Sequence, residues 1–254
     1  MTTISSTVIA HSTWNGKAIV TLSLIYPRFI HGELMTHRVF SRNAMSSRAV
    51  PVHKMIDQVR HDPFVPLYWG KNQPGMQARE ELTGDELQLA QANWRYAAIE
   101  AANRAEAMNA AGLHKQIANR VLEPFQWMHT LVTATEWDNF FALRCHPDAE
   151  PHFQQLAYAM RDSIAASVPV DTSVHLPYAS LKTSQAFMVS AARCARVSYN
   201  KHDGAPADPT EDYDLAVKLR DAGHLSPFEH CATAAHGPHA NFVGWRSFRN
   251  TMGY

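Results

Sequence analysis

Alternating apolar and polar residues mark one clear strand near the start of the chain. Residues 17–26, K-A-I-V-T-L-S-L-I-Y, alternate and are rich in β-branched side chains. This pattern favours a strand with one buried face. Pro27 ends it, and an arginine-rich segment follows at once. We expect that segment to begin a helix whose free N–H groups and positive end attract phosphate.

Apolar side chains at helical spacing predict a series of helices after this strand. Thr83 and Glu86 form a capping-box pattern at the start of the longest helix, and Gly112 follows its end. Pro151 suits the first position of another helix. The predicted helices span residues 83–111, 113–120, 137–144, 151–166, 185–197 and 211–222.

Two segments lack this periodicity. Residues 61–83 hold three prolines and two glycines, which predicts an irregular loop of a length often found in lids or interface segments. Residues 200–210 predict a surface loop. Because no linker divides the chain, we expect a single domain over residues 1–254. Its predicted class is α+β, with a mainly antiparallel sheet flanked by helices.

The composition describes a compact globular protein without a global excess of charge. Hydrophobic residues make up 46% of the 254 residues, and Lys plus Arg equals Asp plus Glu at 23 each. This balance argues against duplex nucleic acid as a partner, because duplex binders usually carry a basic face. The N-terminus has neither a basic head nor a long apolar run. We therefore expect no signal peptide, no membrane anchor and a cytoplasmic location.

Cysteine and histidine spacing predicts neither a disulfide framework nor a metal site. Cys145, Cys194 and Cys231 form no C-x-x-C pair. His236 and His239 are separated by a Gly-Pro step that denies them the helical geometry of a metal-binding pair. Cys145 follows an arginine and is a candidate reactive thiol, but we favour its interpretation as a buried helix cysteine.

The densest group of polar side chains lies at residues 36–48, T-H-R-V-F-S-R-N-A-M-S-S-R, with one histidine, three arginines, three serines and an asparagine. Guanidinium groups form fork-shaped, charge-assisted hydrogen bonds to phosphate, and short hydroxyl and amide side chains fill the remaining acceptor sites. The segment therefore predicts binding of a nucleotide or dinucleotide phosphate. An ordinary solvated arginine-rich segment is the alternative.

The spacing in this segment resembles the signature of the flavin-dependent thymidylate synthases, R-H-R-x-x-S-x-N-E-x-S-x-R. Thr36 replaces the first arginine of that signature and Ala44 replaces the glutamate. The positions that agree are His37, Arg38, Ser41, Asn43, Ser46 and Arg48. Two further segments, A-R-V-S-Y at residues 195–199 and H-L-S-P-F-E-H at residues 224–230, are similar to family elements that normally precede the R-H-R element.

The reversed order of these elements suggests an internal repeat. Residues 27–38 have the family pattern P-x-F-V-x-x-x-x-F-x-H-R, and residues 241–250 repeat its skeleton without the His-Arg pair. We expect each copy to follow a strand and to begin a helix. Related strand-helix units would then lie near residues 17–48 and 231–254.

Segments further along the chain resemble other functional elements of the family. Arg120, in L-H-K-Q-I-A-N-R, resembles a nucleotide-binding arginine, with Asn119 as the alternative. In W-D-N-F-F-A-L-R, Asn139 and Arg144 fall on positions that in the family contact the nucleotide base and the cofactor. Residues 133 and 135 are threonines, where the family has a flavin-binding asparagine and arginine.

The resemblance implies a role for each matching position. Arg144 and Ser46 are the implied catalytic residues. The residues implied to bind the substrate are Glu33, Ser46, Arg48, Arg120 and Arg144, and Glu33 stands where the family has glutamine. The residues implied to bind the cofactor are His37, Arg38, Ser41, Asn43, Asn139 and His230. A histidine satisfied by its neighbours in the core is the alternative for His230.

The implied activity is that of a methyltransferase that passes a one-carbon unit to C5 of a pyrimidine deoxynucleoside monophosphate, from dUMP to dTMP. Its implied cofactors are FAD, NADPH and methylenetetrahydrofolate, and its implied assembly is a homotetramer with shared sites. Flavin supplies hydride in this chemistry, while the protein holds the phosphate and stabilises charge on the base. A hydroxymethylase of dUMP or dCMP, and a nucleotide-binding protein that has lost flavin, are the alternatives.

Overall fold

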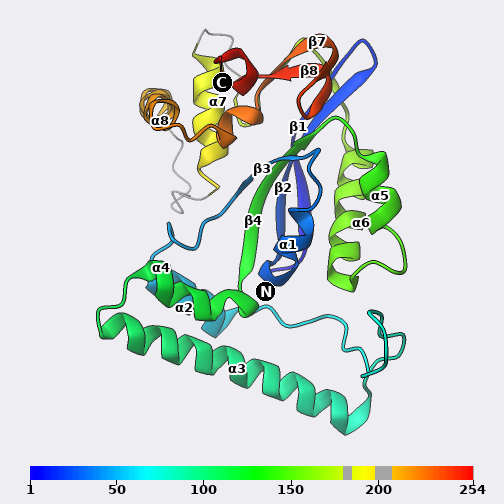
Figure 1. The fold of residues 1–254 in the computed structure, drawn as a ribbon, viewed down its shortest axis with the longest axis vertical. Coiled ribbons are helices and arrows are strands. Elements are labelled where there is room, and N and C mark those ends of the chain that lie inside the picture. The colour runs from blue at the N-terminus through cyan, green and yellow to red at the C-terminus, as the bar shows by residue number, and fades with distance from the viewer. Residues whose placement is uncertain (180–184, 198–207, 254) are drawn as a thin grey trace.

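The computed structural model describes residues 1–179, 185–197 and 208–253. Most of the loop predicted at residues 200–210, and the end of the A-R-V-S-Y segment, lie outside the described residues. The described chain contains a five-stranded and a three-stranded sheet, with helices packed against them (Figure 1). The predicted α+β class with a mainly antiparallel sheet is confirmed.

The larger sheet has the strand order β3-β4-β2-β1-β5, and only the short β1–β5 pair is parallel. Its strands are β1 (Ser5–Trp14), β2 (Lys17–Pro27), β3 (Ser41–Ala44), β4 (Trp127–Ala134) and β5 (Val170–Asp171). Asn15 and Gly16 connect β1 to β2 with φ angles of 48° and 72°, as a two-residue hairpin turn requires. The predicted strand at residues 17–26 is confirmed as β2, the central strand of this sheet.

Helices α5 (Asp138–Arg144) and α6 (Pro151–Ala166) lie beside the β1–β2 hairpin (Figure 1). Phe153, Leu156 and Met160 recur at helical spacing on α6 and pack in one buried cluster with Leu22 and Leu24 of β2. Burying each such side chain contributes about 1.5–3 kcal/mol to folding. This packing fixes α5 and α6 relative to the central strand, and both predicted helices are confirmed.

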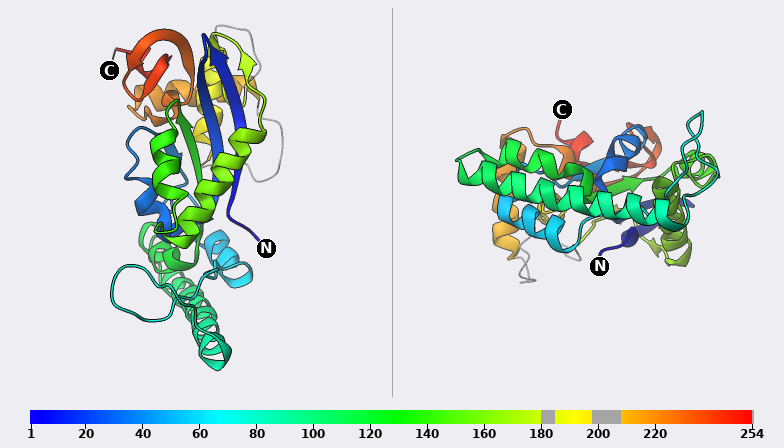
Figure 2. Two further views of the ribbon diagram at one scale, coloured as in Figure 1. Left: turned by 90° about the vertical axis from the view of Figure 1, so that its right-hand side faces the viewer. Right: turned by 90° about the horizontal axis from the view of Figure 1, so that it is seen from below.

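A second group of helices lies at one end of the larger sheet. It comprises α2 (Val52–His61), α3 (Gly84–Ala110), α4 (Lys115–Ala118) and the 3-10 helix η2 (Asn119–Phe125). Figures 1 and 2 show α3 running across this end of the molecule, opposite the C-terminal strands. Within the described chain no helix is both long enough and apolar enough to span a membrane.

The helix ends differ in detail from the sequence prediction. Thr83 precedes α3, but its side chain makes no capping hydrogen bond, so the predicted capping box is wrong. The end of α3 before Gly112 is confirmed, and Gly112 has a φ of 88°, which glycine adopts without strain. The helix predicted at residues 113–120 is only the short α4, and the chain continues through Pro124 as η2.

The arginine-rich segment does not begin a helix. The 3-10 helix η1 (Arg28–Ile30) and α1 (His31–Leu34) end before it. The segment then turns, forms β3 and pairs with β4, where Ser41 lies opposite Thr133. The expected helix N-terminus for phosphate is therefore wrong, because pairing with a distant strand determines the conformation of these residues.

The C-terminal part, residues 185–197 and 208–253, packs at the other end of the larger sheet (Figure 1). The smaller sheet has the order β6-β7-β8. Its first strand, β6 (Val174–His175), precedes the C-terminal part in the sequence. The elements of the C-terminal part are α7 (Ala186–Ala195), α8 (Pro209–Asp221), η3 (Ser226–Glu229), β7 (Ala232–His239), β8 (Phe242–Ser247) and η4 (Arg249–Thr251). The helices predicted at residues 185–197 and 211–222 are confirmed as α7 and α8.

The second copy of the proposed repeat has a different local structure from the first. Its residues form β8, so the helix expected to begin there is wrong. Phe242 and Trp245 are buried in a cluster with Ile19 of β2, and Gly244, with a φ of 78°, disfavours a helix. The relation between the two units, and the single domain, stay predictions.

Candidate active site

Arg144, the last residue of α5, reaches α1 and the turn that follows it. Its Nε donates a hydrogen bond to Nε2 of His37 at 2.9 Å, and its NH1 group donates to Oε2 of Glu33 at 3.1 Å. The Arg144 Cζ atom also lies 4.6 Å from the centroid of the Phe153 ring, a favourable cation–π contact. The structure thus brings three predicted residues together, and we call Glu33, His37 and Arg144 the Arg144 cluster.

His37 is neutral at physiological pH in this arrangement. Burial, with added repulsion from Arg144 and Arg42, lowers the pKa of His37 to about 4. Nε2 of His37 can therefore accept the hydrogen bond from Arg144. Burial raises the pKa of Glu33, Arg144 opposes that rise, and Glu150 adds to it. Arg144 is consequently held by one neutral acceptor and one carboxylate.

A cavity of about 570 Å³ opens beside the Arg144 cluster. Its lining residues are Glu33, Arg144, Asp148, Glu150, Pro151 and, from the irregular loop at residues 61–83, Tyr68, Gly70, Met76, Gln77 and Ala78. The size is typical of a small-molecule site. Because three carboxylates and one guanidinium line it, the cavity suits the uncharged base or ribose of a nucleotide better than its phosphate.

The other predicted substrate residues lie apart from this cavity. Ser46, Arg48 and Arg120 do not line it. We call these three residues, which we expected to bind the phosphate, the phosphate cluster. Arg48 is exposed, and within the described parts of the chain its guanidinium has no hydrogen-bond or ion-pair partner. Arg120 forms an exposed ion pair with Glu123 at 2.7 Å. One chain therefore does not unite the phosphate cluster with Arg144.

Asn119 holds the turn that carries Ser46 and Arg48. Its side chain is fully buried, and Nδ2 donates to the carbonyl oxygens of Ser47 at 2.7 Å and Val50 at 3.1 Å. Asn119 was the alternative to Arg120 as a nucleotide contact. In the structure, the Asn119 side chain instead fixes the turn at residues 46–50 through these two hydrogen bonds.

The predicted cofactor residues are spread over several surfaces. Arg38 and Asn139 are exposed, whereas His37 belongs to the Arg144 cluster. Asn43 faces the C-terminal part, where its Nδ2 donates to the carbonyl oxygen of Cys194 at 2.8 Å. Ser226 donates to Oδ1 of Asn43 at 3.5 Å. The Asn43 amide thus anchors the C-terminal part to β3.

His230 lies in the core, within a buried polar chain that joins the two sheets. Its Nδ1 is 2.8 Å from Oγ1 of Thr133, which is 2.7 Å from Oγ1 of Thr21. Thr21 in turn meets Nε2 of His175 at 2.8 Å, and Nδ1 of His175 meets Ser12 at 2.9 Å. Burial lowers the pKa of both histidines to about 3. The structure therefore places His230 in the core but satisfies only one of its ring nitrogens, because Nε2 is buried without a hydrogen-bond partner among the described residues.

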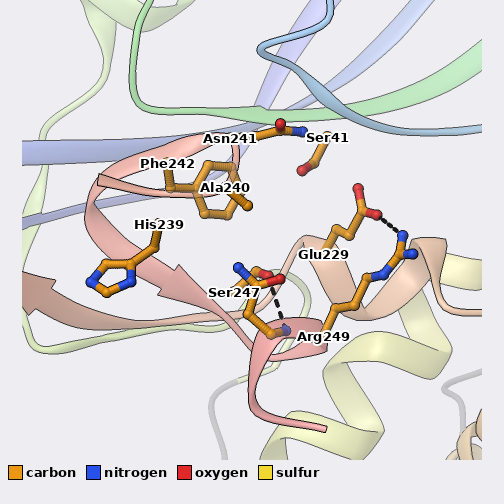
Figure 3. Close-up of a pocket in the computed structure, with 9 residues that line it drawn as sticks. Ser41, Glu229, His239, Ala240, Asn241, Phe242, Ser247 and Arg249 are labelled. Carbon is orange, nitrogen blue, oxygen red and sulfur yellow. Dashed lines mark hydrogen bonds and ion pairs between the residues drawn. The ribbon is translucent and has the colours of Figure 1, made fainter. Parts of the chain in front are cut away.

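A pocket of about 260 Å³ separates Ser41 from the C-terminal hairpin of β7 and β8 (Figure 3). Its lining residues are Ser41, Glu229, His239, Ala240, Asn241, Phe242, Ser247, Arg249 and Asn250. Ser41 is only 3% exposed, and its hydroxyl points into the pocket. Arg249 forms an ion pair with Glu229 at the edge of this space (Figure 3). We call it the Ser41 pocket.

Sequence reasoning missed Arg42 as a supporting residue. Its NH1 group donates to the carbonyl oxygens of Met35 at 2.7 Å and His37 at 3.3 Å, which fixes the turn that carries His37. The signal was weak because the family signature leaves this position open. Side-chain alternation along β3, which separates Arg42 from Ser41 and Asn43, is the pattern that indicates it.

Cys145 follows Arg144 at the end of α5 and is partly buried. Burial raises the pKa of its thiol, and Arg161 only partly opposes that rise. A nucleophilic cysteine needs a lowered pKa. The environment therefore favours the interpretation as a buried helix cysteine over that of a reactive thiol.

Solved structures with a similar fold and a matching family model identify the family of this chain. Two crystal structures of the UMP/dUMP methylase PolB from Streptomyces cacaoi have a similar fold. The structure with 5-Br UMP gives a TM-score of 0.54 at 17% identity, over 65% of this chain and 90% of that chain. The structure with 5-Br dUMP gives a TM-score of 0.51 at 15% identity, over 65% of this chain and 91% of that chain. A sequence search of curated proteins finds no match.

A family model for the thymidylate synthase complementing proteins, Thy1, matches residues 7–170. This range contains the arginine-rich segment and the segment that ends at Arg144, and it ends before the C-terminal part. It covers more than half of the chain. The resemblance inferred from the motifs is confirmed, and the chain belongs to the Thy1 family of thymidylate synthase complementing proteins.

Proposed function

We propose that this chain transfers a one-carbon unit to C5 of a pyrimidine deoxynucleoside monophosphate, as a flavin-dependent thymidylate synthase does. The observation that carries the proposal is Arg144, held by His37 and Glu33 beside a cavity of nucleotide-base size. Membership of the Thy1 family and the fold likeness to a UMP/dUMP methylase support it.

Arg144 is the residue that we propose to stabilise charge on the base. Only its Nε and NH1 groups are bound in the cluster, which leaves further N–H donors for a base carbonyl oxygen. Before C5 attacks the one-carbon donor, the enolate in which C5 is nucleophilic carries negative charge on such a carbonyl oxygen. A preorganised donor at this position lowers the barrier by about 3–4 kcal/mol. Glu33 places a hydrogen-bond acceptor beside the donors of Arg144. The pair therefore complements the edge of a pyrimidine, where a carbonyl acceptor lies beside an N–H donor.

We propose that the phosphate binds to Ser46, Arg48 and Arg120 of a second copy of the chain. More carboxylates than cations line the cavity beside Arg144. These carboxylates repel a phosphate. Arg48, in contrast, presents a guanidinium to solvent. Sharing the site between subunits unites the two clusters, in keeping with the proposed homotetramer.

FAD, NADPH and methylenetetrahydrofolate are the proposed cofactors. When bound, a reduced flavin supplies the hydride that turns a transferred one-carbon unit into a methyl group. The chain's own residues bind and orient the nucleotide and hold it at Arg144. The buried, pocket-facing hydroxyl of Ser41 is the feature of this structure that fits such a cofactor.

Subunit mixing tests the shared site. At dUMP concentrations too low to saturate the Arg48→Ala variant, Arg144→Ala and Arg48→Ala subunits should each have little activity alone, because the first change lowers turnover and the second lowers nucleotide affinity at every site. Random pairs of the two should regain activity at about a quarter of the sites, since half of the pairs are mixed and each mixed pair holds one intact site. Arg104→Ala, an exposed change on α3, serves as the control. Mixtures that stay inactive while each variant remains folded and assembled would contradict sharing.

Glu33 favours one second candidate, a hydroxymethylase that acts on dCMP or dUMP. A carboxylate accepts hydrogen bonds readily from the exocyclic amino group of cytosine. Incubation with dUMP and dCMP, followed by mass spectrometry of the nucleotide, distinguishes the candidates. A methylated uracil product supports the first, a hydroxymethylated product supports the second, and no product with either nucleotide contradicts both.

A further inference from the structure

We propose that the Ser41 pocket receives the polar edge of the flavin ring, so that the C-terminal hairpin supplies flavin contacts within the same chain. This inference rests on the proposed function. The hairpin lies outside residues 7–170, the part that matches the family model. The contacts are therefore particular to the C-terminal part of this chain.

The first argument is the state of Ser41. Its side chain is 3% exposed and its hydroxyl points into the pocket (Figure 3). Among the described residues no side chain or backbone group forms a hydrogen bond with that hydroxyl. The hydroxyl is therefore free to form a hydrogen bond with a polar ligand in the pocket.

The second argument is the chemistry of the lining. Asn241 offers an amide that both donates and accepts, Arg249 offers donors, and Glu229 offers an acceptor. Phe242 adds an aromatic ring. The pyrimidine edge of a flavin ring presents carbonyl, N–H and carbonyl in sequence, which this set of side chains complements. The volume of about 260 Å³ is small for a dinucleotide, so the remainder of the cofactor lies outside the pocket.

The third argument is what the hairpin rests on. Thr133 and Thr135 of this chain stand where the family resemblance implies a flavin-binding asparagine and arginine. Both threonines bind the C-terminal part instead, Thr133 through His230 at 2.8 Å and Thr135 by accepting from the backbone N–H of Val243 at 2.9 Å. The turn of the hairpin docked there carries an amide, that of Asn241, and η4, which follows the hairpin, carries the guanidinium of Arg249. The chemistry that β4 lacks is thus present on the neighbouring hairpin.

Titration of FAD into the purified chain tests the proposal. Binding is measured by the change in flavin fluorescence and in the flavin absorption band at about 450 nm. Asn241→Ala and Arg249→Met should each weaken FAD binding at least tenfold. Ser41→Leu, which fills the pocket, should abolish the spectral change on binding. Arg104→Met changes an exposed arginine of α3 that does not line the pocket, and this variant should bind FAD as the unmodified chain does.

Two further measurements keep the outcomes distinct. Thermal unfolding of each variant excludes a misfolded protein, and dUMP affinity reports on the proposed nucleotide site independently of flavin. FAD affinity that is unchanged in Asn241→Ala and Arg249→Met overturns the inference and leaves the proposed function intact. A chain that binds dUMP but not FAD also overturns it. A chain that binds neither nucleotide nor flavin contradicts the proposed function itself.

Discussion

The Arg144 cluster and the phosphate cluster are both cationic, yet they differ in how their charges are held. Arg144 is 22% exposed and is bound by His37, Glu33 and the Phe153 ring. Arg120 is 48% exposed and, among the described residues, pairs with its near neighbour Glu123, and Arg48 faces solvent. The first cluster is preorganised by its own chain. The second is exposed, and its binding of a phosphate stays a prediction.

This difference separates two kinds of contribution to function. A half-buried guanidinium in fixed geometry acts strongly on a developing charge, because solvent screens it little. Exposed arginines attract a phosphate but add little to the stability of the fold. Mutations in the first cluster should therefore change turnover, and mutations in the second should change nucleotide affinity.

The largest expected effect comes from Arg144→Ala. Loss of its guanidinium should reduce kcat by about 10²–10³-fold while the fold remains, as measured by steady-state kinetics and circular dichroism. Arg161→Ala is the matched control, because Arg161 also lies over an aromatic ring, that of Tyr158, but is exposed on α6. Unchanged turnover in Arg144→Ala would remove the role assigned to Arg144.

The double change Ser46→Ala with Arg48→Ala tests the phosphate cluster. Nucleotide affinity should fall at least tenfold, equivalent to about 1.4 kcal/mol, because a charged and a neutral donor to phosphate are both lost. Isothermal titration calorimetry with dUMP measures it. If dUMP binds the double variant as tightly as it binds the unmodified chain, its phosphate lies elsewhere.

Acid should distinguish the two clusters, because only the Arg144 cluster contains a histidine. The pKa of His37 is about 4 in the fold and about 6.5 in an unfolded chain. Between these values the unfolded chain binds the proton that the fold excludes, so the free energy of unfolding falls as pH falls. The contribution of His37 is at most about 1.4 kcal/mol per pH unit.

Urea unfolding at several pH values between 7 and about 4 measures this dependence. His37→Gln should make the fall in stability with acid shallower, although His175 and His230 still contribute because their pKa values are also lowered, to about 3. An identical slope in the variant would show that His37 does not titrate as described.

The smallest expected effect on stability comes from Arg120→Ala. Its exposed ion pair with Glu123 should contribute less than about 0.5 kcal/mol to the free energy of unfolding. Urea unfolding measures that change, and dUMP titration should show weaker binding in the same variant. A large loss of stability would mean that Arg120 supports the fold, which would weaken the contrast between the clusters.

Local patterns predicted the elements whose burial follows their own periodicity. The helix at residues 151–166 is an example, because it buries one face in the core. The strand at residues 17–26 also forms, but the expectation of one buried face is wrong, because Ile19 and Thr21 on the opposite face are buried against the smaller sheet. The pattern could not predict β3, since Ser41 pairs with Thr133 far along the chain. It also failed at residues 242–247, where a resemblance to a helical segment outweighed the β-forming side chains Phe242 and Val243.

The candidate site shows the same limit. Resemblance to the family pointed to Glu33, His37 and Arg144, which lie together in the fold, and their roles toward a ligand stay predictions. It did not identify Arg42, whose contacts are to backbone carbonyls at a position that the signature leaves open. Nor did it indicate that the C-terminal hairpin faces Ser41, because that proximity arises only when the two sheets pack together.

The polar chain from Ser12 through His175, Thr21 and Thr133 to His230 gives each inner member a partner on both sides. Breaking one link leaves two buried groups without a partner, which favours joint opening of the two sheets where His175 of β6 meets Thr21 of β2. The backbone amides of Thr21, Thr133 and His175 should therefore exchange with deuterium at similar slow rates, as members of one cooperative unit.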